Sequence, residues 1–217
     1  MEEAAELFAA LKANDVQRVR ELLDASPALA AAAAPDGTSA ILTAAYHRAT
    51  DVLALLVSRA PPLSIFEAAA VGDCGRLSAL IAHDPGAAVR FSHDGWSALH
   101  LTAFFSRTEA ALLLLAHGAD ARALSQNPMM NQPLHAAAAG QAAAPLVHAL
   151  LDAGADPNAR QRGGYCALHS AAQNGNEALV RLLLARGADK SPAGADGRTP
   201  IELAREKGHA AVAALLV

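Results

Sequence analysis

The chain has 217 residues and a formal net charge of −4, with 53% hydrophobic, 18% charged and only 4% aromatic residues. This apolar fraction is too high, and the charge too low, for a disordered chain. The mild negative charge argues against nucleic-acid binding, which normally uses a strongly basic surface. The two cysteines, Cys74 and Cys166, are far apart, which indicates neither a disulfide framework nor a zinc site and fits a reducing compartment.

The N-terminal segment is acidic where a secretory signal would be basic, and no apolar run approaches the ~18 residues that a membrane helix needs. We therefore expect a cytoplasmic protein that does not bind membranes. Alanine, the best helix former, is abundant, so helix should dominate. The preference for arginine over lysine, with abundant alanine and glycine, is typical of a GC-rich genome and suggests a bacterial source.

One pattern of helix-forming residues repeats along the whole chain, and this repetition determines the expected architecture. Its clearest copies read SALH, QPLH and CALH, and each is followed 18 or 19 residues after the histidine by the glycine of a Gly-Ala-Asp triplet. Weaker copies precede them, and a last copy has glutamate in place of histidine. The equivalent positions are residues 8, 42, 66, 100, 135, 169 and 202.

Local signals agree with two short helices in each copy. Ser39, Ser97 and Thr199 suit helix N-caps, because a side-chain oxygen can accept a hydrogen bond from an otherwise unpaired backbone N–H. Pro133 and Pro200 suit the first position of a helix. Neither helix of a copy can bury its apolar face alone, so the copies must stack on one another.

These motifs resemble the ankyrin repeat over essentially the whole chain. The resemblance implies an all-α ankyrin-repeat solenoid of about seven helix-turn-helix units with short β-hairpin fingers, forming one domain over residues 1–217. The expected units are an N-terminal cap (1–34), a first unit (35–62), a short unit (63–91), three further units (92–125, 126–160 and 161–193) and a C-terminal cap (194–217).

The step from position 42 to position 66 is about ten residues shorter than the others. Arg59, Ala60, Pro61 and Pro62 lead almost directly into the next helix, so the unit 63–91 should lack a hairpin and the stacking angle there should change. The chain shows no HExxH, CxxC, GxSxG or phosphate-binding glycine motif, so we expect no catalytic residues, metal or cofactor. The resemblance implies that His100, His135 and His169 are structural.

The resembled family binds partner proteins through its concave face. This face is lined by the finger tips and by residues near the end of the first helix of each unit. Five of the eight aromatic residues fall on such positions here, and Trp and Tyr are common in interface hot spots. The sequence leaves open whether one phenylalanine packs instead under a neighbouring finger. The candidate partner-binding residues are Tyr46, His47, His93, Asp94, Trp96, Phe104, Phe105, Met129, Asn131 and Tyr165.

We therefore expect a non-enzymatic scaffold or adaptor, a monomer that binds an unidentified protein and no nucleic acid. Two alternatives stay open. One is a small-molecule binder or enzyme with a pocket near the second and third units, which would need His47, His93 and Asp94 to converge. The other is a structural protein that assembles with its own copies, which would bury Trp96 in a contact between copies.

Overall fold

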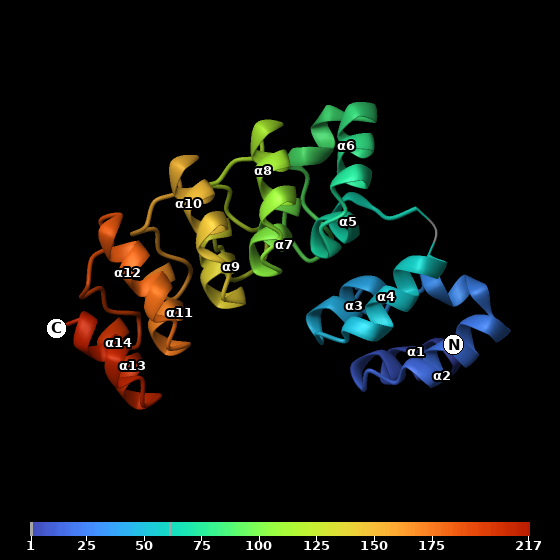
Figure 1. Ribbon diagram of the computed structural model, residues 1–217, viewed down its shortest axis with the longest axis horizontal. Coiled ribbons are helices and arrows are strands. Elements are labelled where there is room, and N and C mark those ends of the chain that lie inside the picture. Colours follow the sequence, from blue (N-terminus) through green and yellow to red (C-terminus); the bar gives the residue numbers. More distant parts are fainter. Residues whose placement is uncertain (1, 61) are drawn as a thin grey trace.

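The computed structural model describes residues 2–60 and 62–217; the expectation for Pro61 therefore lies outside the described residues. The described chain is an all-α solenoid in which consecutive helices pair across tight turns and the pairs stack into an arch (Figure 1). The first helices of the pairs form the inner row: α1 (Glu2–Lys12), α3 (Ala40–Tyr46), α5 (Ile65–Val71), α7 (Ala98–Phe104), α9 (Pro133–Gly140), α11 (Ala167–Gln173) and α13 (Pro200–Glu206).

The second helices form the outer row of the arch: α2 (Val16–Ala25), α4 (Thr50–Arg59), α6 (Cys74–His83), α8 (Thr108–Ala116), α10 (Ala144–Asp152), α12 (Glu177–Ala185) and α14 (Ala210–Leu215). Two 3-10 helices, Pro27–Ala31 and Pro85–Val89, follow α2 and α6. No helix in the described ranges is long and apolar enough to cross a membrane.

The core is continuous along the arch and consists mainly of leucine and alanine side chains. Each inner helix packs against the inner helices before and after it, and small residues allow close approach. Gly140 gives the clearest case, because a Cβ atom there would stand 1.9 Å from the carbonyl oxygen of Phe104. The backbones of α7 and α9 are therefore in direct contact.

The turns inside the pairs share one backbone device. Each contains a residue with positive φ, which lets the chain reverse after the first helix. Three of these residues are glycines and four are not: Asn14, Arg48, Gly72, Ser106, Gln141, Gly175 and Gly208. Their spacing follows that of the sequence repeat.

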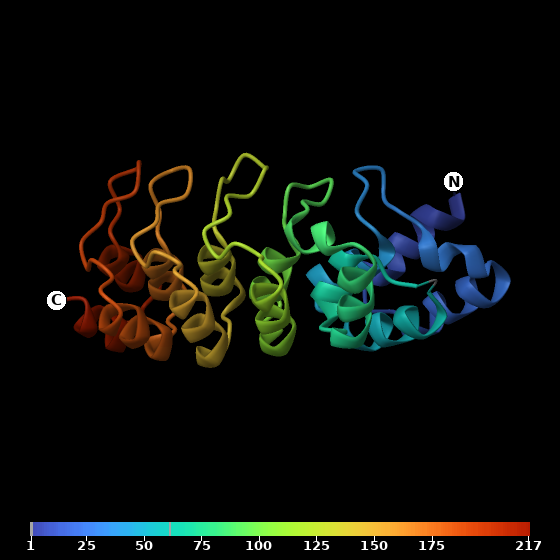
Figure 2. The same ribbon diagram turned by 90° about the horizontal axis from the view of Figure 1, so that it is seen from above.

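Loops connect most pairs and project to one side of the arch as fingers (Figure 2). The expected β-hairpins are not confirmed, because no regular strand forms in the described residues and only two isolated antiparallel bridges occur there, Ala33 to Ser39 and Phe91 to Ser97. Backbone hydrogen bonds join neighbouring fingers; for example, Gln126 N–H donates to Gly95 O at 2.8 Å.

The structure also departs from regular stacking at the short unit. α4 ends at Arg59 and α5 begins at Ile65, so no finger projects between them. In the described part of the chain, α4 and α6 make little contact, whereas every other pair of consecutive outer helices packs together. The arch is therefore least continuous between α4 and α5.

The three repeated histidines join α7, α9 and α11 to the finger that follows each of them. His100, His135 and His169 are buried, and the Nε2–H of each donates to a backbone carbonyl of that finger, at 3.0 Å to Asn131, 3.0 Å to Ala159 and 3.3 Å to Arg198. Their Nδ1 atoms face the cap residues; Cys166 N–H, for example, donates to His169 Nδ1 at 3.0 Å.

Acid should weaken the fold through these histidines. Burial lowers the pKa of all three, that of His100 to about 4. Below pH ~6.5 the unfolded chain binds protons that the folded chain does not, so the unfolding free energy should fall by up to about 1.4 kcal/mol per pH unit for His100 down to pH ~4. Urea unfolding of the wild type and His100→Gln between pH 7.5 and pH 4 tests this; the variant should have the smaller slope, and equal slopes would contradict it.

A side chain at Gly140 should disrupt the contact between α7 and α9. We expect Gly140→Ala to lower the unfolding free energy by about 1–3 kcal/mol, because the new methyl group overlaps backbone that cannot rotate away. Gly75→Ala is the control, since its Cβ meets only Asp73 Oδ1 at 3.5 Å in a helix where alanine is favoured. Chemical denaturation should separate the two variants; equal stability would show that the backbones part readily.

Candidate functional site

Four aromatic side chains meet on the inner side of the arch. Tyr46 ends α3, Trp96 lies in the finger 91–97, and Phe104 and Phe105 end α7. The Tyr46 ring centroid lies 6.0 Å from that of Phe104 and 5.3 Å from that of Phe105. Trp96 and Phe104 meet edge to face at 5.6 Å, as do Phe104 and Phe105 at 5.1 Å. We call these four residues the aromatic cluster.

The cluster spans the short unit. α5 lies between α3 and α7 and carries three fully buried alanines, Ala68, Ala69 and Ala70. Tyr46 therefore reaches across to the two phenylalanines. All four aromatic residues are half-buried. The sequence left open whether one phenylalanine packs within the molecule; both Phe104 and Phe105 pack against the core, and each stays partly accessible.

The two fingers on either side of the short unit also touch. His93 is exposed, and its ring covers Gly37, where a Cβ atom would stand only 2.8 Å from His93 Cδ2. The Asp94 carboxylate accepts a hydrogen bond from the Ser92 hydroxyl. Burial, together with the nearby charge of Asp94, raises the pKa of the Tyr46 phenol above its usual range, so Tyr46 is neutral at physiological pH.

Two hollows flank Tyr46. The larger, of about 640 Å³, lies between α1 and the finger 33–39 and is mostly apolar; its lining includes Ala5, Phe8, Lys12, Pro35, Thr43 and Tyr46. We call it the N-terminal groove. The smaller, of about 320 Å³, lies where α3 faces α7 and is lined by Tyr46, Arg48, Leu53, Phe104, Phe105 and Arg107, among others. We call it the junction cavity.

The remaining candidates are spread along the molecule. His47 is exposed and lines the N-terminal groove. Met129 is 47% exposed on the finger 125–131. The expectation that Asn131 forms an accessible finger tip is wrong, because it is only 2% exposed and its N–H donates to the Ser125 hydroxyl at 3.0 Å. Its carbonyl also accepts from His100, so Asn131 holds the finger instead.

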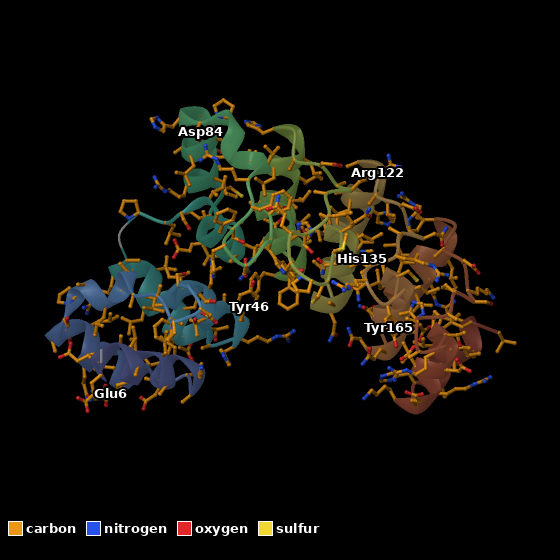
Figure 3. The ribbon with its side chains drawn as sticks, turned by 180° about the vertical axis from the view of Figure 1, so that it is seen from behind. Glu6, Tyr46, Asp84, Arg122, His135 and Tyr165 are labelled. Carbon is orange, nitrogen blue, oxygen red and sulfur yellow. The ribbon has the colours of Figure 1, made fainter. Side chains whose placement is uncertain are left out.

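Tyr165 lies farther along the inner side of the arch, as Figure 3 shows for Tyr46 and Tyr165. Its hydroxyl donates to Asp196 Oδ2 at 2.5 Å, and Arg198 Nε donates to the same oxygen at 2.6 Å. These bonds lower the pKa of Asp196 to about 2 and raise that of Tyr165. Tyr165 is therefore tied to the next finger and does not join the aromatic cluster.

Among the described residues, the groups that the catalytic alternative needs are not brought together. His47, His93 and Asp94 form no hydrogen bonds with one another. His47 lines the N-terminal groove, the His93 ring packs against Gly37, and the Asp94 carboxylate accepts a hydrogen bond from Ser92. Within residues 2–60 and 62–217, no three His, Cys, Asp or Glu side chains are grouped to hold a metal. Cys166 lies 3.1 Å from His169 Nδ1, but burial raises the pKa of its thiol and disfavours the reactive thiolate.

Sequence reasoning missed Arg48 and Arg107, which line the junction cavity. Arg48 occupies the left-handed position of its turn, with φ of 54°, where three of the equivalent turns have glycine. An arginine where other copies have glycine is visible in the sequence and could have marked Arg48 as a candidate. The approach of Arg107 to the end of α5, where its Nε donates to Ala70 O at 2.9 Å, could not be read from the repeat.

The family comparison agrees with this architecture. A family model described as ankyrin repeats (3 copies) matches residues 65–161 and 134–217. The search of curated proteins gave no match. The matched segments span most of the chain, and their repeats coincide with the stacked helix pairs from α5 to α14. The chain therefore belongs to the ankyrin-repeat family.

Proposed function

We propose that the protein is a non-enzymatic scaffold or adaptor that binds a partner protein through the inner side of the arch, over the N-terminal groove and the aromatic cluster. Ankyrin repeats are in general protein–protein interaction modules. One observation carries the choice of surface: an apolar groove of about 640 Å³ adjoins a cluster of half-buried aromatic rings.

This surface has the features of an interface core. Tyr, Trp and Phe contribute large contact areas, and hot spots are enriched in Trp and Tyr. The rings hold one another at fixed geometry, so little side-chain entropy would be lost on binding. His47 and Lys12 provide a polar rim beside the apolar floor. Met129 and Tyr165 extend the proposed surface along the arch.

We expect Ala5→Arg to abolish partner capture. Ala5 is exposed on α1 and lines the N-terminal groove, so an arginine there would fill the groove without entering the core. Ala9→Arg is the matched control, because Ala9 is exposed on the same helix but does not line the groove. Affinity capture from a source-cell extract, with protein identification by mass spectrometry, should return a partner with wild type and Ala9→Arg only.

A second pair of variants tests the aromatic cluster. Tyr46→Ala should weaken binding of the captured partner by about thirtyfold, the usual effect of removing an interface hot spot. Leu112→Ala removes an apolar side chain that is 50% exposed on the outer helix α8 and should change the affinity little. Circular dichroism checks the fold of all four variants. Equal affinity of the folded Tyr46→Ala and wild-type proteins would refute the proposed surface.

A further inference from the structure

The junction cavity combines aromatic walls with two arginines that form no ion pair among the described residues. Tyr46, Phe104 and Phe105 form its apolar side, and Arg48 and Arg107 lie at its edge. No aspartate or glutamate is among its lining residues. Six of the twelve other arginines in the described chain, Arg18, Arg59 and Arg186 among them, pair with carboxylates.

Arg48 is held in a backbone conformation that glycine would adopt more readily. Two other non-glycine residues at equivalent turns use their side chains to tie the next unit: Asn14 Oδ1 accepts from Val52 N–H at 3.4 Å, and Ser106 Oγ accepts from Ala143 N–H at 3.0 Å. Arg48 makes no side-chain hydrogen bond or ion pair in the described ranges. The fold therefore gives no reason for arginine at this position.

Arg107 is fixed in place from within the fold. Its Nε donates to the Ala70 carbonyl at 2.9 Å, and its aliphatic stem lies against Gly72, where a Cβ atom would stand 3.1 Å from Arg107 Cδ. Its two Nη atoms have no partner among the described residues. The bond to Ala70 fixes the guanidinium group at the edge of the cavity, which reduces the entropy lost on binding.

We propose that the junction cavity binds an acidic segment of the partner protein, with a carboxylate held by Arg48 and Arg107 and an adjacent aromatic side chain packed on Tyr46 and Phe105. Charge complementarity selects this occupant, since the cavity offers guanidinium donors and no acidic group. The aromatic walls select an apolar neighbour of the carboxylate. The inference rests on the proposed function and specifies the chemistry of the partner.

Fluorescence anisotropy with a labelled peptide of sequence GSDFEGS tests the proposal. The 217-residue chain should bind this probe measurably below ~1 mM, and binding should weaken as salt rises. The uncharged probe GSNFQGS and the ring-free probe GSDGEGS should each bind at least about tenfold more weakly. Absence of binding at ~1 mM, or equal binding of the uncharged probe, would overturn the proposal.

Arg48→Gly is the decisive variant, because it removes the charge while relieving the left-handed backbone. We expect it to bind GSDFEGS at least about tenfold more weakly than wild type while its melting temperature stays level or rises. Gln141→Gly makes the same backbone change at the equivalent turn outside the cavity and should bind as wild type does. Wild-type affinity in Arg48→Gly would overturn the proposal.

Two further results separate the occupants and the two proposals. If phenylacetate displaces the probe with an affinity equal to that of the peptide, the cavity is a small-molecule site and the assignment to a protein segment is wrong. If Ala5→Arg loses the captured partner but Arg48→Gly keeps full affinity for both partner and probe, the proposed function stands and the role of the junction cavity fails.

Discussion

A helix pair in this chain can bury its apolar faces only against the pairs beside it, and every other feature depends on that stacking. Alanine and glycine bring inner helices into close contact, and buried histidines join α7, α9 and α11 to the fingers that follow them. The stability of each helix pair therefore depends on its interfaces with the two neighbouring pairs, as in other solenoids. A missing contact at one junction must be compensated locally.

Such a junction lies between α4 and α5. The outer helices α4 and α6 make little contact there, and the short connection from α4 to α5 forms no finger. The fingers 33–39 and 91–97 consequently become neighbours, with His93 covering Gly37. Tyr46 reaches Phe104 and Phe105 across the small residues of α5. These aromatic contacts, together with the packing of α3 against α5, connect the first two helix pairs to the rest of the arch.

The same contacts form the surface that we assign to binding. The ring of Tyr46 lies between the N-terminal groove and the junction cavity and lines both. A partner on this surface would contact residues that also hold the junction together. Binding should therefore stabilise the junction, because a ligand that favours the native contacts adds to their stability.

Much of this fold could be predicted because it is periodic. The histidine spacing located the helix pairs, and one short step located the unit without a finger. The contacts across that unit could not be predicted, because they join residues 58 and 59 positions apart that no repeat relates. Asn131 was misjudged for a similar reason: it is buried, and its N–H donates to the Ser125 hydroxyl across the finger. The place of Arg107 at the junction cavity could not be predicted either, because it is set by the hydrogen bond from Arg107 Nε to the Ala70 carbonyl.

The central claim is that the aromatic cluster holds the two sides of the short unit together. A double-mutant cycle with Tyr46→Ala and Phe105→Ala tests it most directly, because their ring centroids lie 5.3 Å apart. Urea unfolding of the wild type, both single variants and the double variant should give a coupling free energy of about 0.5–1.5 kcal/mol. Additive effects of the two substitutions would mean that the rings do not stabilise each other and would contradict this account.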